Sequence, residues 1–369
     1  QTDTECILHG YEEWGQGVVD HLRGMFAFAL WDQTRQTLFL ARDRLGIKPL
    51  YYYWDGRRFA FASEIKALTA LPKANLGQDH SALWDYLTYL YIPSPKTVYK
   101  HIRQVPAGHT LTVIPNNAPR IQEYWGLPEW GTPIRVDDKT LKTGWPDAVE
   151  ALRSKLRETV HMHLMADVPV GVQLSGGIDS STVAALTASS PNAPLKTFSV
   201  GFDIAEHTEL PYARQVATAL GTIHHESICT SGGLSESLHR MLEIYDQPFA
   251  DSSGIPTLAV SELASTQVKA VLSGDGGDEI FAGYNWHRSY LELPRADHAK
   301  QLLYNKLLMP VMGALSPLPK VTGLISHYQI DARGKTGVER YGALRSHVKS
   351  FQKSRLLPDL RHEFHDYDD

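Results

Sequence analysis

Two hydrophobic spacings divide this chain. In its first part, apolar and polar positions alternate, which is the spacing of half-buried β-strands. The predicted strands lie at residues 25–31, 37–41, 50–54, 58–62, 109–114 and 120–124. Turn residues at Asp55-Gly56 and at 115–117 separate two pairs of these strands and predict hairpins. The first part is therefore predicted to be antiparallel and rich in β-structure, after a short helix that Thr2 or Asp3 caps.

Strands alternate with helices from Val168 onward. The predicted strands are 168–174, 196–202, 223–228 and 268–272, and helices are predicted to begin near Ile178, Pro211, Leu234 and Pro256. Such alternation predicts a parallel sheet with helices on both faces. Ligands bind sheets of this kind at the carboxyl ends of the strands. Three loops are therefore predicted to form one site: residues 175–181, 200–202 and 273–279.

The change of pattern sets the predicted domain boundaries. Residues 1–125 form the first domain, and residues 147–369 form the second, which opens with a helix at 147–164. Between them, residues 126–146 contain several prolines and glycines and predict an extended crossover. Two further helices are predicted at 299–312 and 340–351.

Composition narrows the class of protein. The 369 residues suffice for two domains, and 43% hydrophobic residues allow ordinary buried cores. A formal net charge of −5 gives no electrostatic reason to expect nucleic acid or an anionic membrane as a partner. Cys6 and Cys229 match neither a zinc spacing nor a disulfide framework, and a reducing cytoplasm suits them. No apolar run approaches the ~20 residues of a membrane span, and no signal peptide is recognisable.

The stretch 168–181 predicts a binding site for an anion. Its strand leads through Ser175-Gly176-Gly177 into the helix from Ile178. Glycines let the backbone approach an anion, and the free N–H groups at a helix N-terminus point toward it. Asp179 would repel a phosphate unless it holds a Mg²⁺ that the phosphate also binds. The alternative is a strand-to-helix turn capped by Asp and Ser, whereas a Walker loop is excluded because no Lys follows the glycines.

A second loop carries a concentration of acidic residues. Residues 273–279 contain three glycines and three carboxylates directly after an apolar strand. The carboxylates repel one another unless a cation is present. Asp179 and Asp278 are therefore predicted to share Mg²⁺ with the phosphates of ATP. A solvated turn without a ligand is the alternative reading.

The stretch at residues 42–48 is predicted to serve the structure rather than a phosphate. Its charged residues are Arg42, Asp43, Arg44 and Lys48. They are predicted to form charge pairs that brace the two domains, and Glu64 is predicted to pair with one of these bases.

Together these strings resemble the synthetase domain of the glutamine-dependent asparagine synthetases, an α/β parallel-sheet domain of the ATP-pyrophosphatase type. The resemblance rests on residues 168–181, 198–202, 221–226, 246–256 and 272–284. It implies an ATP site formed by Gln173, Leu174, Ser175, Gly176, Gly177, Asp179, Ser180, Val200, Ser273 and Gly274. It further implies that Asp275 is the catalytic acid for forming an acyl-adenylate, and that Asp179 and Asp278 bind Mg²⁺. The family's later Arg-x-Pro-Phe-Leu-Asp string is absent from the chain.

The first domain resembles the glutaminase domain of the class II glutamine amidotransferases, an α+β fold of the N-terminal-nucleophile type. The matching strings are 3–5, 24–29, 42–51 and 62–68. The resemblance implies that Asp3 binds the α-amino group of glutamine, and a helix cap is the alternative for this residue. In that family an N-terminal Cys attacks the glutamine amide, whereas this sequence begins with Gln1. Cys6 is predicted to be a buried structural thiol, and the chain is predicted to be a fragment that lacks residues at both ends.

The two resemblances imply a glutamine-dependent asparagine synthetase. It would convert ATP, aspartate and glutamine to asparagine, AMP, pyrophosphate and glutamate through a β-aspartyl-AMP. ATP and Mg²⁺ are the implied cofactors, the partners are small-molecule substrates, and a cytoplasmic homodimer is the expected form. Two alternatives stay open: a related amidotransferase that acts on a sugar acid, a peptide or a lactam precursor, and a non-catalytic nucleotide-binding homologue.

The 369-residue chain is predicted to release no glutamate from glutamine, because its sequence offers no nucleophile in the position that the resemblance requires. A coupled glutamate assay on the recombinant chain measures this directly. Turnover above the blank would overturn the prediction.

Overall fold

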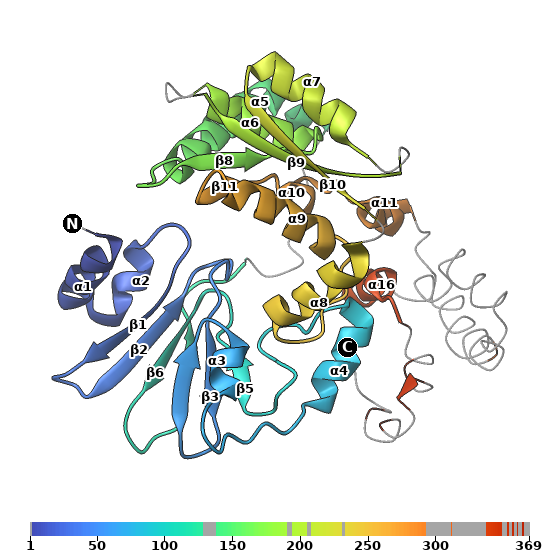
Figure 1. The fold of residues 1–369 in the computed structure, drawn as a ribbon. Helices are drawn as coiled ribbons and strands as arrows, with labels where there is room; N and C mark the ends of the chain where they lie inside the picture. The colour runs from blue at the N-terminus through green and yellow to red at the C-terminus, as the bar shows by residue number, and fades with distance from the viewer. Residues whose placement is uncertain are drawn as a thin grey trace. The chain divides into compact units, whose positions relative to one another are not determined.

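The computed structural model describes residues 2–127, 138–189, 194–204, 208–230, 233–292 and 337–348, with single residues Val311, Lys353, Leu356, Leu357, Leu360 and Phe364. The chain forms two compact units (Figure 1). The first comprises Gln1–Gly131, Tyr245–Ala250 and Ala296–Asp369, and the second comprises Thr132–Ile244 and Asp251–Arg295. None of the described helices is long and apolar enough to cross a membrane.

Two antiparallel sheets build the first unit, which confirms the β-rich prediction. One has the strand order β1-β2-β6-β7, and the other has the order β4-β3-β5. The strands are β1 (Ala27–Asp32), β2 (Thr37–Arg42), β3 (Tyr51–Trp54), β4 (Phe59–Ala62), β5 (Ile102–Gln104), β6 (His109–Val113) and β7 (Arg120–Glu123). The sequence did not predict β5, because a strand of three residues is too short to show an alternation.

The described part of the first unit also contains helices. They are α1 (Asp3–Trp14), α2 (Val18–His21), α3 (Ile65–Thr69), α4 (His80–Tyr89) and α16 (Gly337–Arg345). The side chain of Thr2 accepts a hydrogen bond from the N–H of Glu5 at 3.2 Å and so caps α1, as predicted. Tyr11 of α1 packs on Phe39 of β2, with 5.7 Å between the ring centroids. The helical position Cys6 is exposed, so the prediction of a buried thiol is wrong.

The charged loop after β2 bonds to backbone rather than to opposite charges. The Arg42 guanidinium donates to the carbonyls of Lys48, Val105 and Gly46 at 2.5–2.8 Å. Asp43 is buried, and its carboxylate accepts from the N–H groups of Leu45, Ile47 and Lys48. The predicted charge pairs are therefore wrong for Arg42 and Asp43. Glu64 pairs with Lys66 at 3.4 Å instead of with a base of this loop.

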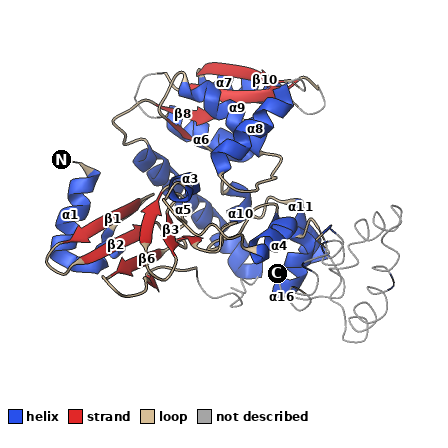
Figure 2. Ribbon diagram, turned by 60° about the horizontal axis from the view of Figure 1, so that its bottom comes forward, coloured by secondary structure: helices blue, strands red, loops and turns tan. Residues whose placement is uncertain are grey.

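The second unit contains the predicted parallel sheet. Its order is β10-β9-β8-β11, and every neighbouring pair is parallel. The strands are β8 (Val170–Gln173), β9 (Lys196–Phe202), β10 (Ile223–Cys229) and β11 (Ala270–Leu272). The helices are α5 (Asp138–His163), α6 (Ile178–Ala188), α7 (Leu210–Leu220), α8 (Leu234–Tyr245), α9 (Gly254–Ser265), α10 (Gly277–Phe281) and α11 (Asn285–Glu292). Figure 2 separates these helices and strands by colour.

Hydrophobic cores cover both faces of the parallel sheet, as predicted. On one face, Val172 and Leu174 pack with Ala184 of α6 and Ala213 of α7. On the opposite face, Phe198 of β9 packs with Ala264 and Val268 from α9 and the turn after it. In Figure 1, α6 and α7 accordingly lie above the sheet and α9 lies below it. Helices on both faces leave only the strand ends open to a ligand.

The predicted extended crossover at 126–146 is wrong in its second half. Helix α5 begins at Asp138, nine residues before the predicted start at 147, and it contains Pro146. Leu141 and Trp145 continue the spacing of Val149 and Leu152, so the helical signal was present in the sequence and the proline obscured it. Of the crossover, residues 128–137 lie outside the described residues. The predicted helix 299–312 does so too, apart from Val311.

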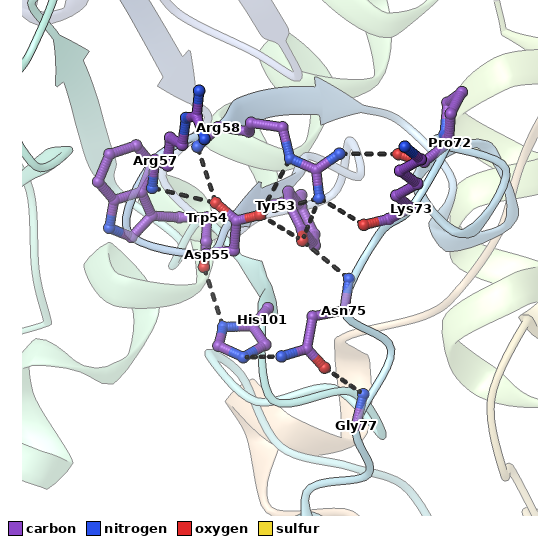
Figure 3. Close-up of polar contacts among 10 residues, drawn as sticks. All are labelled: Tyr53, Trp54, Asp55, Arg57, Arg58, Pro72, Lys73, Asn75, Gly77 and His101. Carbon is purple, nitrogen blue, oxygen red and sulfur yellow. Dashed lines mark hydrogen bonds and ion pairs between the residues drawn. The ribbon is translucent and has the colours of Figure 1, made fainter.

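Asp55 organises the turn between β3 and β4 (Figure 3). Its carboxylate accepts from the N–H of Arg58 at 2.8 Å, from the hydroxyl of Tyr53 at 2.8 Å and from Nε of Arg58 at 3.0 Å. Arg58 in turn donates to the carbonyls of Pro72 at 2.7 Å and Lys73 at 2.6 Å. The hydrogen bonds from the Arg58 N–H and from Tyr53 lower the pKa of Asp55 well below its ordinary value. This network ties the hairpin to the loop that follows α3.

Replacing Asp55 by Asn is expected to lower the thermal midpoint by a few degrees near neutral pH, because one acceptor oxygen is lost. The folded-state pKa of Asp55 is lowered, so its carboxylate stabilises the fold fully above the ordinary Asp pKa of about 3.9. That stabilisation is lost as the pH falls below this value toward the folded-state pKa. The difference in thermal midpoint between parent and D55N should therefore shrink below about pH 4.

Thermal unfolding followed by circular dichroism at several pH values measures this difference. D20N is the matched control, because Asp20 is an exposed carboxylate on α2. A deficit in D55N that stays constant with pH would contradict the assignment.

Candidate functional site

The loop after β8 forms the first part of the candidate site. Ser175 and Ser180 share a hydrogen bond between their hydroxyls at 2.9 Å, and the Ser175 N–H donates to the Ser180 hydroxyl at 3.2 Å. The Gly177 N–H donates to Oγ of Ser175 at 3.2 Å. Helix α6 begins at Ile178, and none of the described side chains caps it. The first N–H groups of α6 are thus left for an anionic ligand or solvent.

Gly176 is fixed by its neighbour in space. Its φ is +86°, which L-residues with a side chain rarely adopt. A Cβ at this position would lie 2.6 Å from the backbone N of Ala213 and from the backbone C of Tyr212. The first turn of α7 therefore packs directly on Ser175-Gly176-Gly177, which is called the glycine turn below. Sequence reasoning missed Tyr212 and Ala213 because no local pattern marks this contact.

The acidic loop lies against the glycine turn, because β11 pairs with β8. A Cβ at Gly274 would lie 2.7 Å from the N of Ser180. A Cβ at Gly277 would lie 2.5 Å from the carboxyl carbon of Asp179. Since such distances are shorter than van der Waals contacts allow, the glycines are what lets the two loops meet. The structure thus brings Ser180 and Asp179 together with Gly274 and Gly277.

The acidic side chains of this loop point in different directions. Asp275 accepts a hydrogen bond from the hydroxyl of Ser273 at 2.9 Å. Glu279 accepts one from the hydroxyl of Tyr284 at 2.8 Å. The carboxylate of Asp278 lies against Gly283, which follows the C-terminal end of α10. Asp179 touches the residue before Asp278, and the Asp278 carboxylate itself is turned toward Gly283.

The donor chemistry at the meeting of the loops fits Mg²⁺. This ion takes carboxylate oxygens, usually one or two from the protein, and fills its other positions with phosphates and water. Asp179 supplies such a carboxylate against Gly277, and Asp278 directly follows that glycine in the sequence. Among the residues that the structure describes, no group of three or more His, Cys, Asp or Glu side chains could hold a metal ion. A metal at this place would therefore depend on the ligand for most of its coordination.

Two of the predicted nucleotide-lining residues, Leu174 and Val200, lie at or near the carboxyl ends of the strands β8 and β9. Val200 belongs to β9, which continues to Phe202 and pairs with β10 as far as Cys229, so the predicted loop at 200–202 is wrong. Leu174 is buried in the core on the α6 and α7 face, and its N–H donates to the carbonyl of Phe198 at 2.8 Å. The side chain of Leu174 is therefore not available to a ligand. Its backbone carbonyl accepts a hydrogen bond from the Ser199 hydroxyl and has one further lone pair. Gln173 is partly buried and ends β8 beside Phe198.

Asp3 lies in the first unit, beside a cavity of about 480 Å³. Residues of α1 and β1 line this cavity, together with Lys48, Pro49 and Ser63. The carboxylate of Asp3 accepts a hydrogen bond from the N–H of Thr4 at 2.8 Å. The first turn of α1 therefore carries both the cap, from Thr2, and an acidic side chain at the rim of a cavity.

Two family models match the chain. The model described as asparagine synthase matches residues 151–362, and the model described as a glutamine amidotransferase domain matches residues 1–125. The boundary between the two matches falls in the region where the sequence changes its hydrophobic spacing.

Several named relatives are similar over most of the chain. A Methanocaldococcus jannaschii protein named "Putative asparagine synthetase (glutamine-hydrolyzing) 2" is 37% identical over 89% of this chain and 61% of its own length. Asparagine synthetase (glutamine-hydrolyzing) 1 of Bacillus subtilis is 33% identical over 84% of this chain and 48% of its own length. Amidase chyE of Penicillium rubens is 33% identical over 81% of this chain and 45% of its own length. The chain thus spans about half to three fifths of the relatives that it matches.

Gly176→Ala is expected to destabilise the second unit by roughly 1–3 kcal/mol, since it adds strain at a positive φ and a clash with α7. The neighbouring Gly177→Ala should cost less, because its φ is −69° and the new Cβ would meet only the flexible Ser175 hydroxyl at 3.3 Å. Urea unfolding of both variants measures the difference. Equal losses would show that α7 does not constrain the turn.

Proposed function

The chain belongs to the asparagine synthase family, and on this basis we propose that its second unit activates a carboxylic acid with ATP. In the proposed reaction, an oxygen of the acid attacks the α-phosphorus of ATP and pyrophosphate leaves. Ammonia then attacks the acyl carbon of the acyl-AMP, and AMP leaves as the amide forms. Aspartate is the proposed acid and asparagine the proposed product.

The contact between the glycine turn and the acidic loop carries this proposal. Ser180 and Asp179 at the start of α6 lie directly against Gly274 and Gly277. An anion-binding turn and a carboxylate-rich loop at neighbouring strand ends suit a nucleotide whose phosphates carry a metal ion. A solvated turn without a ligand would not require glycines at the positions where the two loops approach each other.

Each part of the site has a distinct proposed task. The first N–H groups of α6, with the hydroxyls of Ser175 and Ser180, would hold the leaving pyrophosphate. Ser273 and Gly274 would form the floor of the ATP pocket, together with Gln173, Val200 and the backbone of Leu174. Asp275, oriented by Ser273, is the proposed catalytic acid. Asp179 and Asp278 would hold Mg²⁺, which supplies charge neutralisation at the phosphates when it is bound.

The first unit would supply the ammonia. Its match to a glutamine amidotransferase domain supports glutamine as the nitrogen source, and the proposed fold is that of the N-terminal-nucleophile amidotransferases. Asp3, at the rim of the cavity between α1 and β1, would bind the α-amino group of glutamine. Together the two units would make asparagine from aspartate, glutamine and ATP in the full-length protein.

A second candidate keeps the chemistry and changes the acid. Amidase chyE is 33% identical over 81% of this chain, so relatives at this level of identity do not all carry the name of an asparagine synthetase. The adenylating residues would be the same in both cases, because they contact the nucleotide. The residues that bind the acceptor would differ.

The full-length protein is expected to exchange labelled pyrophosphate into ATP only when aspartate is added, and to form asparagine when glutamine is also present. Exchange with another carboxylic acid and none with aspartate would replace the acceptor and keep the adenylation. No exchange with any acid in a panel of amino acids, sugar acids and peptides would contradict adenylation itself.

A pair of glycine variants makes this test specific. In Gly277→Ala, the new Cβ would displace the carboxylate of Asp179, so exchange is expected to fall at least about 100-fold, in line with the loss of a group that stabilises charge. Gly144→Ala in α5 is the control, because nothing lies within 4 Å of its new Cβ. If both variants exchange as fast as the parent, Asp179 has no part in the reaction.

A further inference from the structure

One sequence motif of the second unit has no place in the proposed reaction. It is Gly221-Thr222-Ile223-His224-His225-Glu226, which spans the end of α7 and the first half of β10. These residues run from the end of α7 to the middle of β10, whereas the candidate site lies at the carboxyl ends of β8 and β11. Among the described residues, the hydrogen bonds of Ser175-Gly176-Gly177 do not involve this motif.

The motif holds α7 at its C-terminal end. Gly221, in the left-handed conformation, ends the helix, and the N–H of Thr222 donates to the carbonyl of Ala217 at 3.1 Å. The hydroxyl of Thr222 shares a hydrogen bond of 2.8 Å with that of Thr197 on β9. The end of α7 is thus joined to both β9 and β10.

The same motif also holds α7 nearer its N-terminus. The guanidinium of Arg214 donates to both oxygens of Glu226, from Nε at 2.8 Å and from Nη2 at 2.6 Å. A two-point contact of this kind fixes orientation as well as distance. The paired guanidinium lowers the pKa of Glu226, so the carboxylate is charged at neutral pH.

His224 continues the network into the sheet. Its Nε2 lies 3.1 Å from the Glu226 carboxylate, and its Nδ1 shares a hydrogen bond of 2.9 Å with the hydroxyl of Thr197. Thr197 is fully buried. The next residue, His225, faces the other side of the sheet and stacks on Phe198 at 5.3 Å. Alternate residues of the motif therefore brace the two faces of β9.

Arg214 directly follows the two residues that press on the glycine turn. Tyr212 and Ala213 lie within 2.6 Å of the position that a Cβ of Gly176 would occupy. We propose that Glu226 and Arg214 are positioning residues for the glycine turn Ser175-Gly176-Gly177. By joining the first turns of α7 to β10 as a clamp, they fix the position of Tyr212 and Ala213, against which this turn packs. This inference rests on the proposed nucleotide-binding function of that loop.

Glu226→Gln and Arg214→Lys both test the clamp. Gln offers one acceptor oxygen, and Lys keeps the positive charge but lacks the two-point geometry. In the full-length protein, each variant is expected to raise the KM for ATP in pyrophosphate exchange about 10-fold, by analogy with other residues that act through a neighbour. The KM for the acceptor acid should stay unchanged. Glu150→Gln is the control, because the exposed Glu150–Arg153 pair on α5 is also an ion pair, at 2.9 Å.

Amide hydrogen exchange without nucleotide gives a second readout. In Glu226→Gln, the peptide that covers residues 175–181 is expected to exchange faster than in the parent, while peptides from α9 keep their rates. Unchanged exchange at 175–181 would overturn the positioning role, whatever the activity shows. Uniformly faster exchange across the second unit would also overturn it, because the pair would then serve general stability.

These outcomes separate the inference from the proposed function. A parent protein that neither binds ATP nor exchanges pyrophosphate would contradict the proposed function, and the exchange rates at 175–181 would still decide whether the clamp positions the loop. An ATP-binding parent whose KM does not respond to either variant would contradict the clamp alone.

Discussion

The close approach of backbone to backbone at the strand ends is the constraint on which the second unit depends. Gly176 admits the backbone of α7, Gly274 admits the backbone of α6 at Ser180, and Gly277 admits the side chain of Asp179. Each contact is closer than any side chain would allow. The three elements therefore meet at one place, beside the strand ends of β8 and β11. A nucleotide in this place would contact mainly backbone N–H groups and small hydroxyls, which change little in position because the helices behind them are packed.

Helix α7 connects the glycine turn to the parallel sheet. Its buried residues Ala213 and Ala217 pack with Val172 of β8 and with Leu174 just after that strand, so the helix is seated on the same core that carries the glycine turn. Hydrophobic packing of small residues is not directional, and it allows a helix to slide or rotate. The Arg214–Glu226 hydrogen bonds and the Gly221–Thr222 end are directional, and they select one position of the helix. Hydrophobic packing thus holds α7 against the sheet, and the polar contacts separately fix its orientation.

Charge is used differently in the two units. In the first unit, the carboxylates of Asp43 and Asp55 accept hydrogen bonds from backbone N–H groups, and the Arg42 guanidinium donates to backbone carbonyls. These bonds fix loops and turns. In the second unit, Asp179 and Asp278 lie in the first turns of α6 and α10, and Asp275 lies in the loop between β11 and α10. Carboxylates that fix a turn usually accept several hydrogen bonds from it, as Asp55 does. Of these three carboxylates, Asp275 accepts a hydrogen bond from the Ser273 hydroxyl, and in the described part of the chain none of the three accepts several bonds from the backbone of its own turn.

The sequence by itself determined the two hydrophobic spacings, and hence the antiparallel first unit and the parallel second unit. It also marked the glycine turn and the acidic loop, because glycines and carboxylates after an apolar strand are a local signal. It did not reveal β5, the start of α5 or the exposure of Cys6, since a three-residue strand, a helix with an internal proline and the open face of α1 leave no reliable local pattern. Tertiary structure alone decided that Asp179 lies against Gly277, that Asp278 turns toward Gly283, and that Tyr212 presses on Gly176. These contacts join residues from separate strands and helices, and their geometry depends on the order of strands in the sheet, which local sequence does not encode.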